Sequence, residues 1–376
     1  MYRIGFVIEQ ALGHVTHSLN LRKYVPADPE INARWALPAW QTSGVKAKIP
    51  IYRSNWTIQA GLQARQTIAK WMQEVPVDGL FFHTQVPAIL SQKWLERIPA
   101  LVSLDATPRQ YDRLGAYYEH ETGPAWLEQK KWELNVSCYE KAHHLVTWSQ
   151  WAKQGLVDEY RVPPEKVTVI PPGVDTAEWQ RPIPRRYIPG APIKILFVGA
   201  NLERKGGHLL LEAFRQVQAT SLSSTGNIAE LELHLVTQDT VAPESGVHIY
   251  NDLQPNTPEL RRLFHESDIF CLPTFGDCLP MVLSEAGAAG LPLISTNVAA
   301  IPEVVRDRVT GLLVPPHNTE ALADALNQLI AHVDLRFEYG QKAKVIVQEA
   351  YDVQQNADRL LALLKKTIDE AKTNGK

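Results

Sequence analysis

The stretch PTFGDCLPMVLSEAGAAGLPLISTNVAAIPEVV, residues 273–305, carries a loop, a helical segment and a short apolar strand in succession. Short apolar strands that alternate with helices are typical of parallel sheets covered on both faces. Asp277 lies in the loop, and Glu285, eight positions on, falls inside the predicted helix. The free N–H groups at the start of that helix can bind an anion, and the two carboxylates can accept hydrogen bonds from sugar hydroxyls. The stretch therefore predicts a site for a sugar joined to a nucleoside diphosphate.

The same alternation continues outward on both sides of this stretch. In the second half of the chain we expect strands at 193–200, 232–238, 247–252, 268–274 and 291–297. In the first half we expect them at 2–9, 33–39, 78–84, 100–106, 143–149 and 166–173. Ligands of such sheets bind beyond the carboxyl ends of the strands, and two such domains can enclose a ligand between them. The sequence thus predicts an α/β fold of two Rossmann-like, doubly wound domains facing each other across a cleft.

A proline-rich segment divides the chain near its middle. Residues 181–192, RPIPRRYIPGAP, contain four prolines and one glycine and can continue neither a helix nor a central strand. We interpret them as a linker between a first domain at 1–180 and a second at 193–352; a long surface loop within one domain is the alternative. The last predicted helix, within 353–376, is long and amphipathic and could pack back on the first domain.

Composition excludes several classes of protein. A chain of 376 residues predicts two domains, and a net charge of −3 gives no general attraction to nucleic acid. The three cysteines, Cys138, Cys271 and Cys278, fit neither a disulfide framework nor a zinc site, so a reducing cytoplasm is the simplest interpretation. The apolar run before Glu9 is too short for a signal peptide or membrane span, so we expect at most peripheral membrane contact.

A second motif, FVGANLERKGG at residues 197–207, lies between a predicted strand and a predicted helix. Gly199 permits a sharp exit from the strand. Arg204 and Lys205 then precede a helix start, where two cations and free N–H groups suit a diphosphate. The alternative is a solvated pair of cations on a surface loop, but the nearby Asp277 and Glu285 favour a binding site.

The C-terminal half resembles the donor-binding domain of the family 4 (group 1) glycosyltransferases, which are retaining enzymes of the two-domain GT-B architecture. The residues that carry the resemblance are GANLERKGG (199–207), the Asp277–Glu285 pair with its spacing, STNVAAIPEVV (295–305) and DRVTGLLVPPHNTEALADAL (307–326). Their order and spacing match over about 130 residues. The resemblance implies that Arg204 and Lys205 hold the donor diphosphate, Glu285 the ribose hydroxyls and Asp277 the transferred sugar. The further donor-side positions that it implies are Gly13, Gly199, Asn201, Leu253, Cys278, Leu279, Pro280, Met281 and Val282.

The chain departs from the family pattern at several points. Asp277 stands where the family usually has glutamate, and its shorter side chain can reshape the sugar pocket. Ala200 and Asn201 follow the loop glycine where an arginine is frequent, and Ala299–Ala300 replace two glycines. Arg204 can supply the missing charge, so the diphosphate site is retained.

The first half resembles the family more weakly. In ALGHVTH, residues 11–17, Gly13 would let the backbone approach the donor, with His14 beside it on the acceptor side; an ordinary βα turn is the alternative. His83 ends a predicted strand, where relatives often carry a histidine near the acceptor. Asp105 occupies a place usually held by a functional histidine and could orient the acceptor or the donor sugar. Their alternatives are a packed histidine and a turn-capping aspartate before Pro108.

The resemblance implies a mechanism with retention, in which the acceptor attacks from the side that the diphosphate leaves. The leaving diphosphate takes the acceptor proton, so no protein nucleophile is needed. Arg204, Lys205 and helix N-termini would stabilise the leaving group, with Asp105 and Asp277 completing the catalytic set. We expect no cofactor and no metal; the co-substrate is a nucleotide sugar, with UDP-glucose or another UDP-hexose as the first choice.

The acceptor is less defined. All ten tryptophans lie between Trp35 and Trp179, and their faces can stack on sugar rings, although single tryptophans more often fill the core. We expect a saccharide or lipid-linked saccharide acceptor and no nucleic acid partner. Two other functions stay open: a nucleotide-sugar-binding subunit without catalysis, which normal turnover would exclude, and a nucleotide-sugar epimerase, which a C2-inverted product would reveal.

Overall fold

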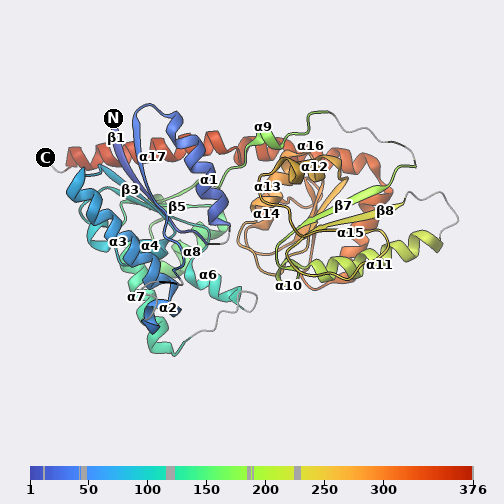
Figure 1. The fold of residues 1–376 in the computed structure, drawn as a ribbon, viewed down its shortest axis with the longest axis horizontal. Coiled ribbons are helices and arrows are strands. Elements are labelled where there is room, and N and C mark those ends of the chain that lie inside the picture. Colours follow the sequence, from blue (N-terminus) through green and yellow to red (C-terminus); the bar gives the residue numbers. More distant parts are fainter. Residues whose placement is uncertain are drawn as a thin grey trace. The chain divides into compact units, whose positions relative to one another are not determined.

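The computed structural model describes residues 1–11, 13–41, 43, 49–115, 123–183, 188, 190–223 and 230–374. The chain forms two compact units. The first contains the described residues of Met1–Arg113, Glu121–Gly173 and Val353–Lys376, and the second contains those of Leu114–His120 and Val174–Asp352. Each unit is built on its own six-stranded parallel sheet (Figure 1).

The sheet of the first unit has the strand order β2-β1-β3-β4-β5-β6. Its strands are β1 (Tyr2–Ile8), β2 (Ile31–Ala36), β3 (Gly79–His83), β4 (Ala100–Leu104), β5 (His144–Thr147) and β6 (Val167–Val169). The helices are α1 (His14–Tyr24), α2 (Pro50–Ser54), α3 (Trp56–Glu74), α4 (Gln85–Ile89), α5 (Gln92–Leu95), α6 (Pro108–Arg113), α7 (Ala125–Lys141) and α8 (Gln150–Tyr160). Two 3-10 turns cover Val25–Ala27 and Pro164–Lys166.

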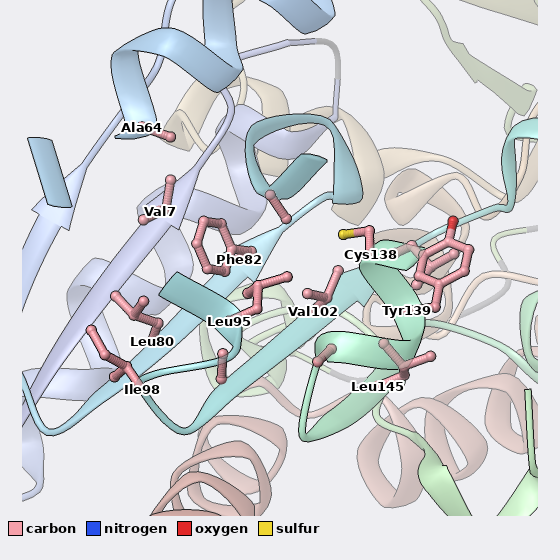
Figure 2. Packing of buried hydrophobic residues seen from close by; sticks show 14 of the residues in the cluster. Val7, Ala64, Leu80, Phe82, Leu95, Ile98, Val102, Cys138, Tyr139 and Leu145 are labelled. Atoms are coloured by element: carbon pink, nitrogen blue, oxygen red, sulfur yellow. The ribbon is translucent and has the colours of Figure 1, made fainter. Parts of the chain in front are cut away.

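Successive strand residues of this sheet face opposite sides, which gives two hydrophobic cores. Phe82 and Val102 pack with Leu95 and Cys138 on the side covered by α3, α5 and α7 (Figure 2). The other side is covered by α1 and by α17 (Val353–Asn374), whose apolar face is buried among strand residues. The α17 residues that close this core are Leu360, Leu361, Leu364 and Ile368. The C-terminal helix therefore packs on the first unit.

The sheet of the second unit has the strand order β12-β11-β10-β7-β8-β9. Its strands are β7 (Ile193–Val198), β8 (Leu231–Val236), β9 (Val247–Tyr250), β10 (Ile269–Leu272), β11 (Leu293–Thr296) and β12 (Gly311–Val314). The helices are α9 (Thr176–Trp179), α10 (Leu202–Lys205), α11 (Gly207–Ser223), α12 (Pro258–Glu266), α13 (Met281–Ala288), α14 (Ile301–Val304), α15 (Thr319–Ala331) and α16 (Val333–Ala350).

Polar residues start many of these helices by accepting a hydrogen bond from a free backbone N–H group. Asn55 accepts from the N–H of Ile58 at the start of α3, and Asn318 accepts from Ala321 at the start of α15. The same device opens α8 at Ser149, α9 at Asp175 and α12 at Thr257. These local signals are why the alternation of strands and helices was readable from the sequence.

Two parallel, helix-covered sheets confirm the predicted fold class. The division between the units falls at Gly173–Val174, before the segment 181–192 that we interpreted as a linker. The reason is α9, because Trp179 packs edge-on against Phe264, with ring centroids 4.9 Å apart, inside the second unit. Residues 184–187 and 189 of that segment lie outside the described residues.

The strand β12 and the long helix α16 of the second unit were not predicted, and neither were its four-residue helices α9, α10 and α14. Strand β12 is only four residues long and pairs in parallel with β11. Helix α16 packs against α13 through glycines: a Cβ on Gly287 would lie 2.7 Å from a methyl of Val347. A Cβ on Gly340 would lie 2.2 Å from the carbonyl oxygen of Gly290. Close backbone contact of this kind leaves a weak periodic signal, because the buried positions are small rather than apolar.

None of the helices in the described part of the chain combines the length and the apolar character that a membrane span requires.

Candidate functional site

Each sheet has one switch point, where the chain reverses its direction of winding and the loops on either side diverge. In the second unit this point lies between β7 and β10, so the loops after Val198 and after Leu272 meet there. In the first unit it lies between β1 and β3, so the loops after Ile8 and after His83 meet. Ligands of open α/β sheets bind at such points, and both carry clustered ionisable side chains here.

The loops of the second unit bring three predicted residues into direct contact. Asp277 Oδ1 lies 2.8 Å from Arg204 Nη1, and Lys205 Nζ lies 2.7 and 2.8 Å from the two Asp277 oxygens. Thr274 donates to Asp277 Oδ2 at 2.7 Å. All three charged side chains are largely buried, between 10 and 18% exposed. Two cations therefore share one carboxylate, and these three side chains keep one net positive charge.

Two glycines shape the loop that holds the cations. A Cβ on Gly199 would lie 2.9 Å from Cγ of Lys205, so the absent side chain makes room for the lysine stem. Gly206 ends α10 in the left-handed conformation, with φ of 72°, and passes close to Pro273. Asn201 starts α10 by accepting a hydrogen bond from the N–H of Arg204, so its side chain organises the loop.

Replacing Gly206 by alanine is expected to destabilise the protein by more than ~2 kcal/mol, because a Cβ there would lie 2.0 Å from the carbonyl oxygen of Pro273. The matched control is Gly190→Ala, which has a similar φ of 80° but no neighbour within 4 Å. It should cost roughly 1 kcal/mol from backbone strain alone. Urea denaturation of both variants measures the difference; equal stability losses would show that close packing at Gly206 is unimportant.

Glu285 lies on α13, which begins at Met281 after Pro280. The segment before this helix is held by a hydrogen bond of 3.1 Å, which the N–H of Ala300 donates to the carbonyl oxygen of Cys278. Glu285 is 8% exposed, and burial raises the pKa of its carboxyl to about 7. No hydrogen bond to its carboxyl is recorded among the described residues. A buried carboxyl without an internal partner is suited to accept hydrogen bonds from a ligand.

The remaining positions that were predicted for the donor side are more dispersed. Cys278 and Leu279 are buried, while Met281 and Val282 are half-buried at the start of α13 after Pro280. Leu253 lies half-buried in the loop after β9, two strands away from β7 in the sheet. In the first unit, Gly13 precedes α1 with an ordinary φ of −65°, and a Cβ there would meet nothing within 4 Å. Neither backbone conformation nor packing within the unit therefore requires glycine at this position.

The switch point of the first unit places His14 between two carboxylates. His14 Nδ1 lies 3.1 Å from Glu9 Oε1, and His14 Nε2 lies 3.5 Å from Asp105 Oδ2. Burial alone would lower the pKa of His14, but the hydrogen bonds and charges of Asp105 and Glu9 raise it to about 10. Burial alone would raise the pKa of Asp105, but its hydrogen bond to His14 and the imidazolium charge lower it. The imidazole is therefore charged at neutral pH.

Two further histidines lie beneath this group and stay neutral. His83 is fully buried, stacks on Trp148 at 4.8 Å, and lies 3.3 Å from Ser103 through Nδ1. Burial and the charge of His14 lower the pKa of His83 well below its ordinary value and that of His17 to about 3. The ring of His83 contacts His14 at 4.6 Å, so His83 supports the more exposed His14 from below.

Sequence reasoning missed Glu9 as a site residue. Its carboxylate accepts hydrogen bonds from Thr84 at 2.8 Å and from the indole of Trp56 at 2.6 Å, in addition to facing His14. Trp56 in turn stacks on Trp40, which is 48% exposed. The signal was present: Glu9 is a carboxylate directly after a buried central strand, at the end of the strand where ligands bind.

Two family models match the chain. The first, described as "Glycosyltransferase Family 4", matches residues 12–178, and the second, "Glycosyl transferases group 1", matches residues 192–332. Among curated proteins, the chain is similar to the putative colanic acid biosynthesis glycosyltransferase WcaL of Salmonella typhimurium, at 31% identity over 229 residues. That alignment covers 58% of this chain and 55% of WcaL, so the chain spans about half the length of this relative.

Solved structures of the same fold cover nearly the whole chain. Sucrose-phosphate synthase from Thermosynechococcus elongatus superposes with a TM-score of 0.75 at 15% identity, covering 98% of this chain and 100% of that one. Anabaena Alr3699/HepE, solved in complex with UDP-glucose, superposes with a TM-score of 0.68 at 14% identity, covering 97% and 100%. The chain has the GT-B fold and belongs to the family 4, group 1, glycosyltransferases.

Proposed function

We propose that the protein transfers a hexose from a UDP-hexose, with UDP-glucose as the first candidate, to a saccharide or lipid-linked saccharide in polysaccharide or glycoconjugate biosynthesis. The observation that carries the proposal is the contact of Arg204 and Lys205 with Asp277 at the switch point of the second unit. Two buried cations and one carboxylate, which together carry one net positive charge next to the start of α13, form a receptor for a diphosphate. The UDP-glucose named for HepE supports the choice of UDP.

The cation pair would stabilise the leaving group. As the bond to the sugar breaks, negative charge collects on the diphosphate, and Arg204 and Lys205, which are held in place by Asp277, would stabilise that charge. The acceptor attacks the face that the diphosphate leaves, and a diphosphate oxygen takes the acceptor proton. The sugar therefore keeps its anomeric configuration, and neither a protein nucleophile nor a metal ion takes part.

For Asp277 we propose a role in addition to the sugar contact that the resemblance implies. Both of its oxygens accept hydrogen bonds within the protein, from Arg204, Lys205 and Thr274. We assign it the positioning of the two cations. It can still meet a sugar hydroxyl through the remaining lone pairs, since an ionised carboxylate has about four acceptor sites.

The first unit has its own cluster of ionisable side chains, which contains His14, Glu9 and Asp105. His14 is charged and held by Glu9, while Asp105 keeps 19% of its side chain exposed and is free to accept a hydrogen bond from a hydroxyl. We propose that Asp105 orients the acceptor hydroxyl and that His14 holds Asp105 in its ionised form. The exposed face of Trp40, linked through Trp56 to Glu9, is a stacking surface for the acceptor sugar.

The variant Asp105→Asn should lower kcat by about tenfold or more and change donor KM little, because it removes an acceptor contact rather than the diphosphate site. It also removes one of the two negative charges beside His14, so the pKa of His14 should fall from about 10. Steady-state kinetics and NMR titration of the histidine measure both effects. A large rise in donor KM with unchanged kcat would place Asp105 on the donor instead.

A thermal-shift screen of UDP, GDP and ADP, with their hexose derivatives, tests the donor class. Ligand binding raises the melting temperature by mass action, by an amount equivalent to about 2.7 kcal/mol at a hundred times Kd. We expect UDP and one UDP-hexose to give the largest rise. Stabilisation by GDP or ADP alone would reject UDP, and stabilisation by none of the three would reject the nucleotide-sugar proposal.

A further inference from the structure

A cluster of metal-ligating side chains lies on the sheet of the second unit, on residues that the sequence analysis treated only as parts of strands. Glu232 and His234 are two positions apart on β8, so their side chains are on the same face. His248 on the edge strand β9 is the register partner of His234 and shares that face. One ligand atom from each residue lies within 4.8 Å of the other two.

We propose that Glu232, His234 and His248 bind a divalent transition metal of the Zn²⁺ class. A tetrahedral site with bonds of about 2.0–2.1 Å separates its ligand atoms by about 3.3 Å. His234 Nε2 and Glu232 Oε2 are already 3.1 Å apart. His248 has an exposed side chain on an edge strand, so its ring can turn to close the third distance. Two imidazoles and one carboxylate are a donor set suited to zinc.

The surroundings of His234 favour a ligand role. Its Nδ1 lies 2.9 Å from the hydroxyl of Tyr250, whose oxygen can accept a hydrogen bond from Nδ1–H when Nε2 binds the metal. Metal-bound histidines usually donate their second N–H in this way, which fixes the ring. Without metal, the other tautomer satisfies both contacts, with Nε2–H donating to Glu232 and Tyr250 donating to Nδ1.

A lysine beside Glu232 has to move away when a cation binds. Lys194 on β7 lies 3.8 Å from Glu232 Oε2, with 30% of its side chain exposed, and it can swing into solvent when a cation binds. The binding step moves one proton from Nε2 to Nδ1 of His234 and leaves the carboxylate of Glu232 ionised. A solvent molecule completes the coordination on the exposed side. The metal would join the edge strand β9 to β8, next to the loop that carries Leu253.

Isothermal titration of the full chain with ZnCl₂, after treatment with chelator, tests the site. We expect the wild type to bind one Zn²⁺ per chain. The affinity for this Zn²⁺ should fall at least tenfold in both His248→Ala and Glu232→Gln. His332→Ala removes an exposed histidine of the same unit outside the cluster and should bind like the wild type. Zn²⁺ should also raise the melting temperature of the wild type and of His332→Ala, but not of His248→Ala.

Because His248 is exposed, its replacement should leave the core intact. A loss of Zn²⁺ binding in His248→Ala can therefore be assigned to the missing ligand and not to unfolding. A Zn²⁺ isotherm of His248→Ala that matches the wild type would overturn the proposal. The absence of any Zn²⁺ binding to the wild type would do the same. Glu232→Gln guards against a structural artefact, since it keeps the size of the side chain and removes only its charge.

Discussion

Replacing Lys205 by alanine should weaken the binding of UDP by about a hundredfold. Lys205 Nζ contacts both oxygens of Asp277 and is only 14% exposed, so it is one of two buried cations that can meet the diphosphate. Its loss leaves Arg204 paired with Asp277, and the net charge of the three side chains falls from +1 to zero. A site without net positive charge attracts a dianionic ligand far more weakly.

Isothermal titration with UDP measures this effect, and two further variants make it specific. Lys205→Met keeps the aliphatic stem that packs at Gly199 and removes only the charge, so it should lose as much affinity as the alanine variant. Arg262→Ala removes a cation with 72% of its side chain exposed and should bind UDP normally. Unchanged UDP affinity in Lys205→Met would refute the diphosphate site.

Replacing Glu285 by glutamine should lower UDP affinity by about 10- to 100-fold and at the same time stabilise the protein above neutral pH. The affinity falls because an ionised carboxylate accepts the ribose hydrogen bonds better than an amide does. The stability rises because burial holds the pKa of Glu285 near 7 in the folded protein, against an ordinary 4.5. Ionising this carboxyl therefore opposes folding.

The sign of the pH effect follows from that difference. The folded state holds the proton more tightly, so the stabilising contribution of Glu285 is complete below about pH 4.5 and is lost as the pH rises to about 7. The advantage of Glu285→Gln over the wild type should grow through this window and level off above it, reaching on the order of 3 kcal/mol. Urea denaturation at several pH values measures it, with the exposed Glu349→Gln as control. An advantage that does not change with pH would contradict the assigned cause.

Local signals explain why the position of the loop that carries Arg204 and Lys205 could be predicted from the sequence. Gly199 and Gly206 lie where a side chain would collide with Lys205 and with Pro273, so the glycine spacing reports the real shape of the loop. Arg204 and Lys205 follow a strand that lies at the switch point of its sheet. The local motif and the order of the strands therefore both place these two cations at the end of the sheet where ligands bind.

The pairing of Asp277 with those cations could not be predicted in the same way. Seventy-two residues separate Lys205 from Asp277, and nothing in either motif states whether the carboxylate faces a ligand or the neighbouring loop. The contact depends on the parallel pairing of β7 with β10, which brings the two loops together. Asp277 consequently acts on its partners Arg204 and Lys205 in this structure.

In the first unit, too, contacts between residues far apart in the sequence could not be predicted. Asp105 and His14 were named separately, as residues of two motifs, and Glu9 was passed over. The sheet order places β1 beside β3 and β3 beside β4, so the residues that follow these strands converge. The high pKa of His14 arises only from that convergence, since neither carboxylate is its neighbour in the sequence.

The anomeric configuration of the first product is the sharpest test of a retaining hexosyl transfer. The wild-type protein is incubated with the UDP-hexose that stabilises it most. If no acceptor sugar is added, water is the acceptor and the product is the free hexose. ¹H NMR records the anomeric configuration of the product before mutarotation. We expect UDP release and a product with the α-configuration of the donor. A β-configured product, a C2-inverted sugar or a complete lack of turnover would contradict it.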